Sequence, residues 1–204
     1  MLNFLICFCV SETQIKHGCR WLKVFYHDSS TGIYFSSLSD ALSCNTSYKF
    51  SILGSIDGQY QINGKFEFLL EYPDVEGYNR WKQTLNPKDN PESNGKQATG
   101  YEGISISFPG RYWGGLVKSS DPGTVFDGSA GNVNWWFAIG CKSSSWKPKL
   151  FPGPAISYTE LIPVSKVILW VRNDHLEPIV QETKLFTRVL GSKLITVLSL
   201  IINF

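Results

Sequence analysis

The sequence predicts an all-β fold, mainly an antiparallel β-sandwich of jelly-roll-like type, with one or two short helices. Short apolar or alternating stretches recur between turn residues, and 18 Gly and 10 Pro are spread along the 204 residues. No convincing amphipathic helix longer than about two turns occurs between residues 21 and 172. Because strands do not alternate with helices, a parallel α/β sheet is excluded and antiparallel packing is favoured.

The strands are expected where apolar residues alternate or run together. In chain order they are Trp21–Tyr26, Ile33–Phe35, Lys65–Tyr72, Asn79–Thr84, Ile104–Phe108, Asn134–Gly140 and Val167–Val171. Lys65–Tyr72 is the clearest, because Phe66 and Phe68 alternate with the charged Glu67. We therefore expect Glu67 and Glu71 on a solvated strand face. We also expect the first and last strands, around Trp21 and Trp170, to be neighbours.

The segments between the strands have turn and helix signals. Ser39–Leu42 predicts a short helical turn, because a side-chain oxygen can satisfy the first backbone N–H groups. Tyr48–Ile56 fits a helical face but remains open. Asp121–Gly123 and Asp127–Gly128 predict turns.

The two ends of the chain differ from the middle. Residues 1–16 form an apolar, signal-like or divergent N-terminus, residues 17–173 the β-rich module, and residues 174–204 a divergent, partly apolar tail. Leu194–Phe204 is shorter than the roughly 20 residues that a membrane-spanning helix needs. A membrane partner is therefore expected only if this tail is an anchor.

Charge and cysteine content limit the classes of partner. The net charge is +2 and the basic residues are scattered, so no nucleic-acid partner is expected. There is no C-x-x-C pair and no zinc-ligand spacing. Beyond the N-terminal segment, Cys19, Cys44 and Cys141 allow either one disulfide with a thiol left over or three buried thiols.

Ordered sequence blocks indicate a resemblance. They are F-E-F-L-L-E-Y-P (66–73), Y-N-R-W-K-Q-T-L-N-P (78–87), G-Y-E-G-I-S-I-S (100–107), Y-W-G-G-L (112–116), D-G-S (127–129), N-W-W-F-A-I-G (134–140), P-G-P (152–154) and V-S-K-V-I-L-W-V-R (164–172). Together with W-L-K-V-F-Y-H (21–27), they cover residues 21–172 and resemble an uncharacterised β-rich, lectin-like module of protist and invertebrate proteins. The resemblance implies an extracellular or adhesive setting and transfers no site residues.

Catalytic patterns are sparse. Ser129 lacks a G-x-S-x-G elbow and is expected in a turn. Glu67 and Glu71 lie about 13 Å apart along one strand, beyond glycosidase separations, so a glycan hydrolase using them or Asp74 is a remote alternative. We expect no catalytic residues and no enzyme.

No cofactor is expected either. The candidates for a calcium site are Asp121, Asp127 and Asn132, because a loop-rich stretch there supplies oxygen donors. They lack EF-hand spacing, which favours a role in turns.

Aromatic and polar side chains are interleaved in a way that suits sugars, whose C–H faces pack on rings while their hydroxyls bond to polar groups. The candidate ligand contacts are Asn79, Arg80, Trp81, Gln83, Arg111, Tyr112, Trp113, Asn134 and Trp135. Asn45-Thr46-Ser47 matches the N-glycosylation sequon, with Asn45 as the acceptor.

These observations predict a non-enzymatic, secreted or cell-surface module that binds glycans or matrix components. The alternatives are a structural or protein-interaction domain without a small ligand and, more remotely, a glycan hydrolase. A cytoplasmic location is the alternative to secretion.

Overall fold

A computed structural model describes residues 12–91, 97–108, 113–119, 124–129, 138–142, 164–174, 185–190 and 193–198. The chain divides into two compact units, Met1–Asp174 and His175–Phe204. The second unit begins one residue after the expected start of the C-terminal tail.

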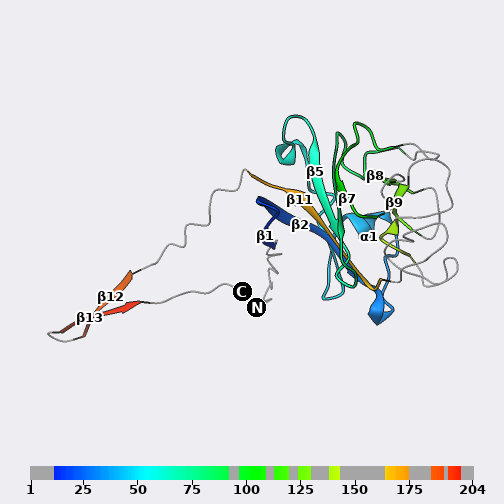
Figure 1. Cartoon of the computed structure of the whole chain (residues 1–204). Helices are drawn as coiled ribbons and strands as arrows, with labels where there is room; N and C mark the ends of the chain where they lie inside the picture. Colours follow the sequence, from blue (N-terminus) through cyan, green and yellow to red (C-terminus); the bar gives the residue numbers. More distant parts are fainter. Residues whose placement is uncertain are drawn as a thin grey trace. The chain divides into compact units, whose positions relative to one another are not determined.

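The first unit is built from antiparallel strands with very little helix (Figure 1). Its elements are β1 (Thr13–Lys16), β2 (Cys19–Asp28), η1 (Ser29–Thr31), α1 (Leu38–Leu42), β3 (Cys44–Asn45), β4 (Lys49–Ser51), η2 (Gly58–Tyr60), β5 (Phe66–Glu71), β6 (Tyr78–Gln83), β7 (Glu102–Ile106), β8 (Trp113–Lys118), β9 (Phe126–Ser129), β10 (Ala138–Ile139) and β11 (Lys166–Arg172). The all-β, mainly antiparallel fold expected from the sequence is confirmed.

The larger sheet has eight strands within the described ranges, in the order β3-β4-β2-β11-β5-β6-β7, with β1 also paired to β2. The strand near the start of the module and the strand near its end are neighbours, since β2 pairs along its length with β11. The prediction that these two strands are adjacent is therefore confirmed.

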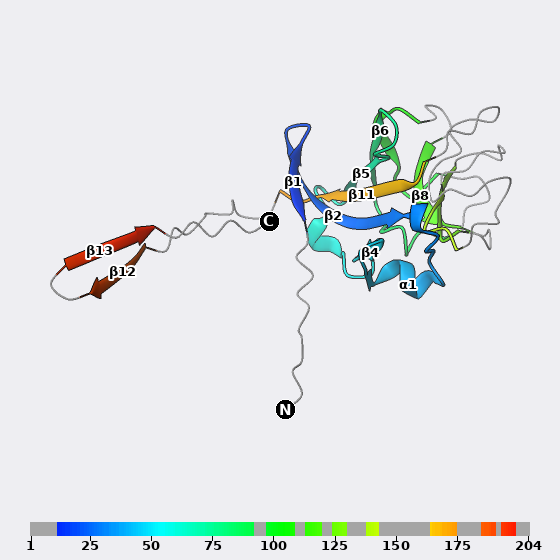
Figure 2. The same cartoon turned by 90° about the horizontal axis from the view of Figure 1, so that it is seen from below.

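A β-bulge in β2 explains why its sequence does not alternate. Leu169 pairs with Phe25 and Trp170 pairs with Lys23, so Val24 is the extra residue. Val24 and Phe25 are consecutive and both fully buried in the same core cluster. Figure 2 shows the long, curved β2 beside β11.

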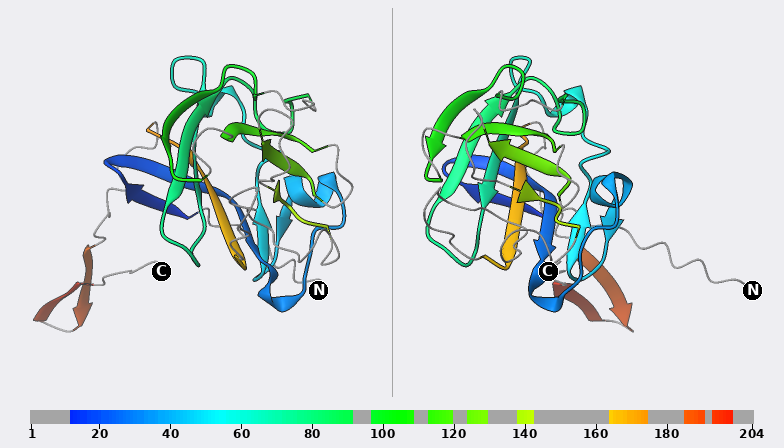
Figure 3. Two further views of the ribbon diagram at one scale, coloured as in Figure 1. Left: turned by 45° about the vertical axis from the view of Figure 1, so that its right-hand side comes forward. Right: turned by 90° about the vertical axis from the view of Figure 1, so that its right-hand side faces the viewer.

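A smaller sheet, β10-β9-β8, covers one face of the larger sheet. In the right-hand view of Figure 3, β8 and β9 lie in front of the larger sheet. The main core fills the space between them and contains residues of both sheets, including Phe68, Trp81, Leu116 and Phe126. Packing of two sheets on one core is the sandwich arrangement.

Asp127-Gly128 lies inside β9 and does not form the predicted turn. The physical reason is close packing: a Cβ atom on Gly128 would lie 2.1 Å from Cζ3 of the Trp113 ring. Glycine is thus required in this strand by the neighbouring indole, and its presence gives a false turn signal.

Ile33–Phe35 is not a strand, contrary to prediction. Its backbone groups bond elsewhere: the Ile33 carbonyl accepts from the His27 ring, and the Phe35 N–H donates to the Cys141 carbonyl at 3.0 Å. A side chain and a residue distant in sequence therefore satisfy the backbone hydrogen-bonding groups of this segment, in place of a neighbouring strand.

The remaining expectations in this region are resolved by the structure. The helical turn at Ser39–Leu42 is confirmed as part of α1, with Ser37 as its N-cap. Tyr48–Ile56 contains strand β4 and turns. Strand β1 begins at Thr13, so the sheet starts before residue 17, the predicted first residue of the module. No disulfide joins Cys19, Cys44 and Cys141, the cysteines of the described ranges.

The other face of the larger sheet is not simply solvated. Trp21, Leu69 and Trp170 form a second buried cluster there. The Glu67 side chain is 1% exposed and lies between two arginines, Arg80 and Arg172. The expected solvated position for Glu67 is wrong, because paired guanidinium groups allow the carboxylate to be buried.

In the second unit, β12 (Leu185–Leu190) and β13 (Lys193–Leu198) form an antiparallel pair. Within the described parts of the chain, no helix has the length and apolar character needed to cross a membrane.

Candidate functional site

Of the predicted ligand-binding residues, those on β6 lie mainly in the interior. Asn79, Trp81 and Gln83 alternate along the strand and are each 0% exposed. The Trp81 ring packs edge-on against Trp113, with 4.8 Å between centroids, and Trp113 is 1% exposed. These indoles bridge the two sheets and present no ring to solvent.

Backbone groups and the indole N–H of Trp81 satisfy the polar side chains on that face. Gln83 accepts from Trp81 Nε1 at 2.8 Å and from the Leu116 N–H at 2.9 Å, and donates to the Leu85 carbonyl at 2.7 Å. Asn79 accepts from the Phe108 N–H at 2.9 Å and donates to the carbonyl of the same residue. Both amides hold loops against the core, as buried polar groups must be bonded.

The expected ligand surface is therefore corrected at Asn79, Trp81, Gln83 and Trp113, which are buried structural residues. Arg80 points to the opposite face, where its Nε donates to Glu67 at 2.7 Å. The other candidates lie outside the described residues: Arg111, Tyr112, Asn134 and Trp135.

The carboxylates considered for hydrolysis are occupied by internal partners. Glu67 binds Arg80 and Arg172, and Glu71 accepts from Lys16 Nζ at 2.5 Å. Asp74 accepts from the Ser165 hydroxyl at 2.9 Å. Each of these three carboxylates therefore has a partner within the fold.

The pKa of Asp74 does not suit a proton donor. Burial raises this pKa, but hydrogen bonds from Ser165 and Lys166 outweigh burial and hold it below its usual value. A glycosidase acid needs a raised pKa.

The described residues contain no group of three or more His, Cys, Asp or Glu side chains placed to hold a metal ion. Of the calcium candidates, Asp127 lies half-buried in β9, and Asp121 and Asn132 fall outside the described ranges.

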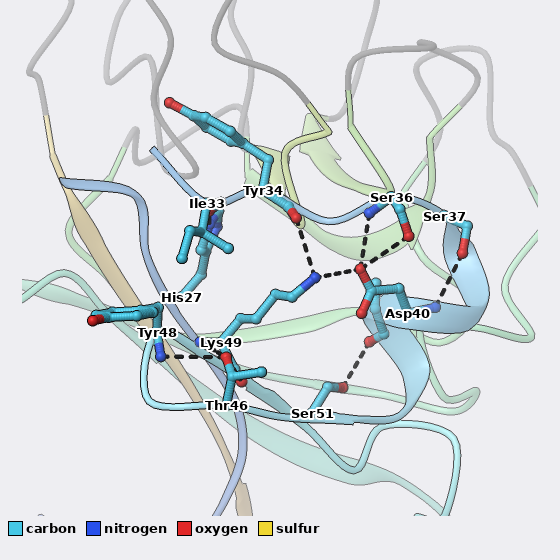
Figure 4. Close-up of polar contacts among 11 residues, drawn as sticks. His27, Ile33, Tyr34, Ser36, Ser37, Asp40, Thr46, Tyr48, Lys49 and Ser51 are labelled. Carbon is cyan, nitrogen blue, oxygen red and sulfur yellow. Dashed lines mark hydrogen bonds and ion pairs between the residues drawn. The ribbon is translucent and has the colours of Figure 1, made fainter. Parts of the chain in front are cut away.

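A different surface gathers exposed aromatic and polar residues, near α1 and β4. Tyr48 is 40% exposed, Ile33 is 38% exposed, and Tyr34 is half-buried. In Figure 4 the rings of Tyr34 and Tyr48 point to the same side of the view, with Ile33 between them. We call these three residues the tyrosine patch.

Lys49 fixes the backbone beneath the tyrosine patch. Its ammonium donates to the Tyr34 carbonyl at 3.1 Å and to Asp40 Oδ2 at 2.5 Å. The backbone N–H of Lys49 donates to Thr46 Oγ1 at 3.0 Å, and the backbone N–H of Tyr48 donates to the same hydroxyl at 3.3 Å. One lysine thus connects both tyrosine-bearing segments to α1 (Figure 4).

Asp40 is the second anchor. Its Oδ2 also accepts from the Ser36 N–H at 2.9 Å and from the Ser36 hydroxyl at 3.2 Å. Burial opposes ionisation of Asp40, but the bonds from Lys49 and Ser36 outweigh it and keep the pKa of this carboxyl below its usual value. Asp40 is therefore an anion at neutral pH and balances the charge of Lys49.

His27 supports the same loop from below. Its Nε2 lies 2.8 Å from the Ile33 carbonyl, and because a carbonyl only accepts, Nε2 carries the proton. The ring packs edge-on against Phe35 at 4.9 Å and Tyr34 at 5.9 Å. Burial lowers the pKa of His27, although the bond to Ile33 partly opposes this, so the ring is neutral at pH 7.

The sequon lies next to the tyrosine patch. Asn45 is exposed in β3, and Thr46 uses its hydroxyl in the turn that leads to β4. Exposure of Asn45 meets the steric requirement for modification, and the predicted glycosylation remains a prediction.

Sequence reasoning missed the tyrosine patch, because it predicts a strand over Ile33–Phe35 and leaves Tyr48–Ile56 open. Asp40 and Lys49 are also separated by β3 and a turn, so no local spacing indicates their ion pair. The available signal was the five serines between Tyr34 and Tyr48, with Asp40 among them.

The chain matches no model of a known protein family, no curated protein and no solved structure. The resemblance to a lectin-like module therefore rests on the sequence blocks alone.

Proposed function

We propose that this protein is a non-enzymatic, secreted or cell-surface module that binds neutral glycans or matrix saccharides through the tyrosine patch. The observation that carries the proposal is a pair of tyrosines, Tyr48 exposed and Tyr34 half-buried, on two segments held by Lys49 and Asp40. Saccharides offer apolar C–H faces to such rings and hydroxyls to the polar groups around them.

Rigid placement of the rings favours binding. Tyrosine contributes a large contact area with few rotatable bonds, so little conformational entropy is lost when a ligand binds. The carbonyl of Tyr34 is bonded to Lys49, and the carbonyl of Tyr48 accepts from the Asp28 N–H at 2.7 Å. The patch is thus ordered before a ligand arrives, which reduces the cost of association.

Charge balance suggests what kind of saccharide fits. The Lys49–Asp40 pair is internally neutral, and Asp28 at the edge of the patch pairs with Lys166 at 3.7 Å. The patch therefore offers no excess charge to steer a sulfated or acidic glycan. Uncharged saccharides are the expected class.

The test is a glycan array probed with the full-length chain and with four single variants. Tyr48→Ala and Tyr34→Ala should each weaken binding by about tenfold, the loss expected when an aromatic anchor worth about 1.4 kcal/mol is removed. Ile104→Ala is the matched control for Ile33→Ala, because Ile104 is 42% exposed on the distant edge strand β7.

A folded chain that binds no saccharide would overturn the proposal. So would saccharide binding that the two tyrosine variants leave unchanged. Concentration-dependent self-association without saccharide binding would favour a protein-interaction domain.

A further inference from the structure

The face of the larger sheet that points away from β8–β10 carries a second constellation of aromatic and charged groups. Trp170 is 1% exposed in this cluster. Lys16, at the end of β1, places its ammonium 4.1 Å from the centre of the Trp170 ring and 2.5 Å from Glu71 Oε2. Trp170 Nε1 donates to the same carboxylate oxygen at 2.7 Å.

This arrangement has the parts of an ammonium-binding site. A ring face attracts a cation, and the effect is strongest for tryptophan. Glu71 supplies the opposite charge and is fixed by its bond to the indole N–H. Its cross-strand neighbours are Tyr78 on β6 and Ile168 on β11, which pack on the same cluster. The lysine side chain therefore meets a carboxylate, an indole face and apolar walls.

A comparison with the adjacent ion pair shows which cation site a ligand can reach. Arg80 lies 5.5 Å from the Trp21 ring and pairs with Glu67, whose side chain is 1% exposed. In the Lys16–Glu71 pair the side chains are 20% and 23% exposed. The carboxylate of the arginine site is thus closed to solvent although Arg80 itself is 17% exposed, whereas in the lysine site both the cation and the carboxylate are partly exposed.

Lys16 belongs to β1, a short strand whose end is also held by a bond from Trp21 Nε1 to the Lys16 carbonyl at 2.9 Å and by the His17 ring, whose centre lies 4.3 Å from that of Tyr78. β1 pairs with β2 over four residue pairs and is followed by a turn in which His17 and Gly18 both have positive φ, 50° and 72°. Ile15, on the same strand, is 70% exposed. Short edge hairpins of this kind open at a lower free energy than core strands.

We propose that Lys16 occupies in cis a recognition site for an alkylammonium group, and that this site takes the lysine side chain of a partner protein when the β1–β2 hairpin tip lifts. The site uses other residues than the tyrosine patch and does not depend on glycan binding. Lys16 acts as an internal competitor that keeps the site closed until a partner displaces it.

The test removes the Lys16 ammonium by mutation and supplies it again as a small molecule. Lys16→Ala removes a propylammonium group, so n-propylammonium chloride is titrated into the full-length variant while tryptophan fluorescence is followed. The account predicts a saturable change with an apparent affinity at least about tenfold tighter than for the wild-type chain, in which Lys16 competes. Neutral n-propanol should give no saturable change.

Two further variants separate site binding from general effects. Lys16→Ala combined with Glu71→Gln should lose the response. Lys23→Ala, which removes a lysine of the partner strand β2, should not create one. If Lys16→Ala fails to fold, Lys16→Thr replaces it, because a β-branched residue suits a strand. Recovery of its folded fluorescence with propylammonium but not with propanol would then support the proposal.

The proposal is overturned if the folded variant responds no more than wild type, or equally to propanol. It is also overturned if neither variant folds in the presence of propylammonium. A failed glycan array leaves this result unaffected, so the two proposals fail separately.

Discussion

Replacing Lys49 with methionine should loosen the segment that carries Tyr34 while the apolar stem stays in place. The variant loses two bonds made by the ammonium, one to Asp40 at 2.5 Å and one to the Tyr34 carbonyl at 3.1 Å. Hydrogen bonds to charged groups contribute about 1.5–3 kcal/mol each. Asp40 keeps its two bonds to Ser36, so we expect a net loss of about 2–3 kcal/mol in the free energy of unfolding.

Burial justifies this magnitude. The side chains of Lys49 and Asp40 are 13% and 19% exposed, so solvent screens the pair only in part. Lys65→Met is the matched control, because Lys65 and Glu102 are 32% and 52% exposed. Removing Lys65 should leave the unfolding midpoint almost unchanged, because solvent screens an exposed ion pair.

The assay is urea unfolding of the full chain, combined with hydrogen exchange of the amides from Tyr34 to Ser36. Lys49→Met should lower the unfolding midpoint and speed exchange in this segment. A double-mutant cycle with Asp40→Asn should give a coupling of about 1–2 kcal/mol. A loss no larger than that of Lys65→Met would refute the role assigned to the ion pair.

Two further perturbations test the core and the buried histidine. Gly128→Ala should destabilise the fold by about 3 kcal/mol, because its Cβ would meet the buried Trp113 ring, whereas Gly64→Ala should cost only about 1 kcal/mol for its φ of +76°. Urea unfolding compares them, and equal losses would contradict the close packing. Burial lowers the pKa of His27, so on acidification the unfolded chain binds a proton at a higher pH than the folded chain does. The free energy of unfolding should therefore fall as the pH drops below about 6.5, the unfolded value, towards the pKa of the folded state. His27→Gln can still donate to the Ile33 carbonyl, and it should flatten the pH dependence of the free energy of unfolding between about pH 7 and 5. A wild-type curve that is already flat over this range would argue against a neutral buried ring.

The strands were predictable wherever the side-chain period of two is intact. β5, β6, β7 and β11 all fall within or beside segments chosen for alternation or apolar runs. β2 was found in spite of its bulge at Val24, which puts two consecutive residues on the core side. Ile33–Phe35 has the apolar composition of a strand, but only Phe35 is buried, and its backbone N–H bonds to the Cys141 carbonyl instead of to a ladder partner.

The binding surface was less predictable, because alternation separates two faces without saying what covers each. The polar residues of β6 suggested a surface, but Asn79 and Gln83 bond to the backbone of Phe108 and Leu116, which are distant in sequence. Such pairing depends on the tertiary fold. The same limitation hid the burial of Glu67, since its two arginine partners lie on β6 and β11.

The most direct test of the central claim is hydroxyl-radical footprinting of the full chain with and without the strongest saccharide from the array. The account predicts that Tyr34 and Tyr48 react in the free protein and are protected by the saccharide, while Trp81 and Trp113 stay unreactive in both states because they are 0% and 1% exposed. Protection that leaves both tyrosines reactive, or strong oxidation of the two indoles in the folded protein, would contradict it.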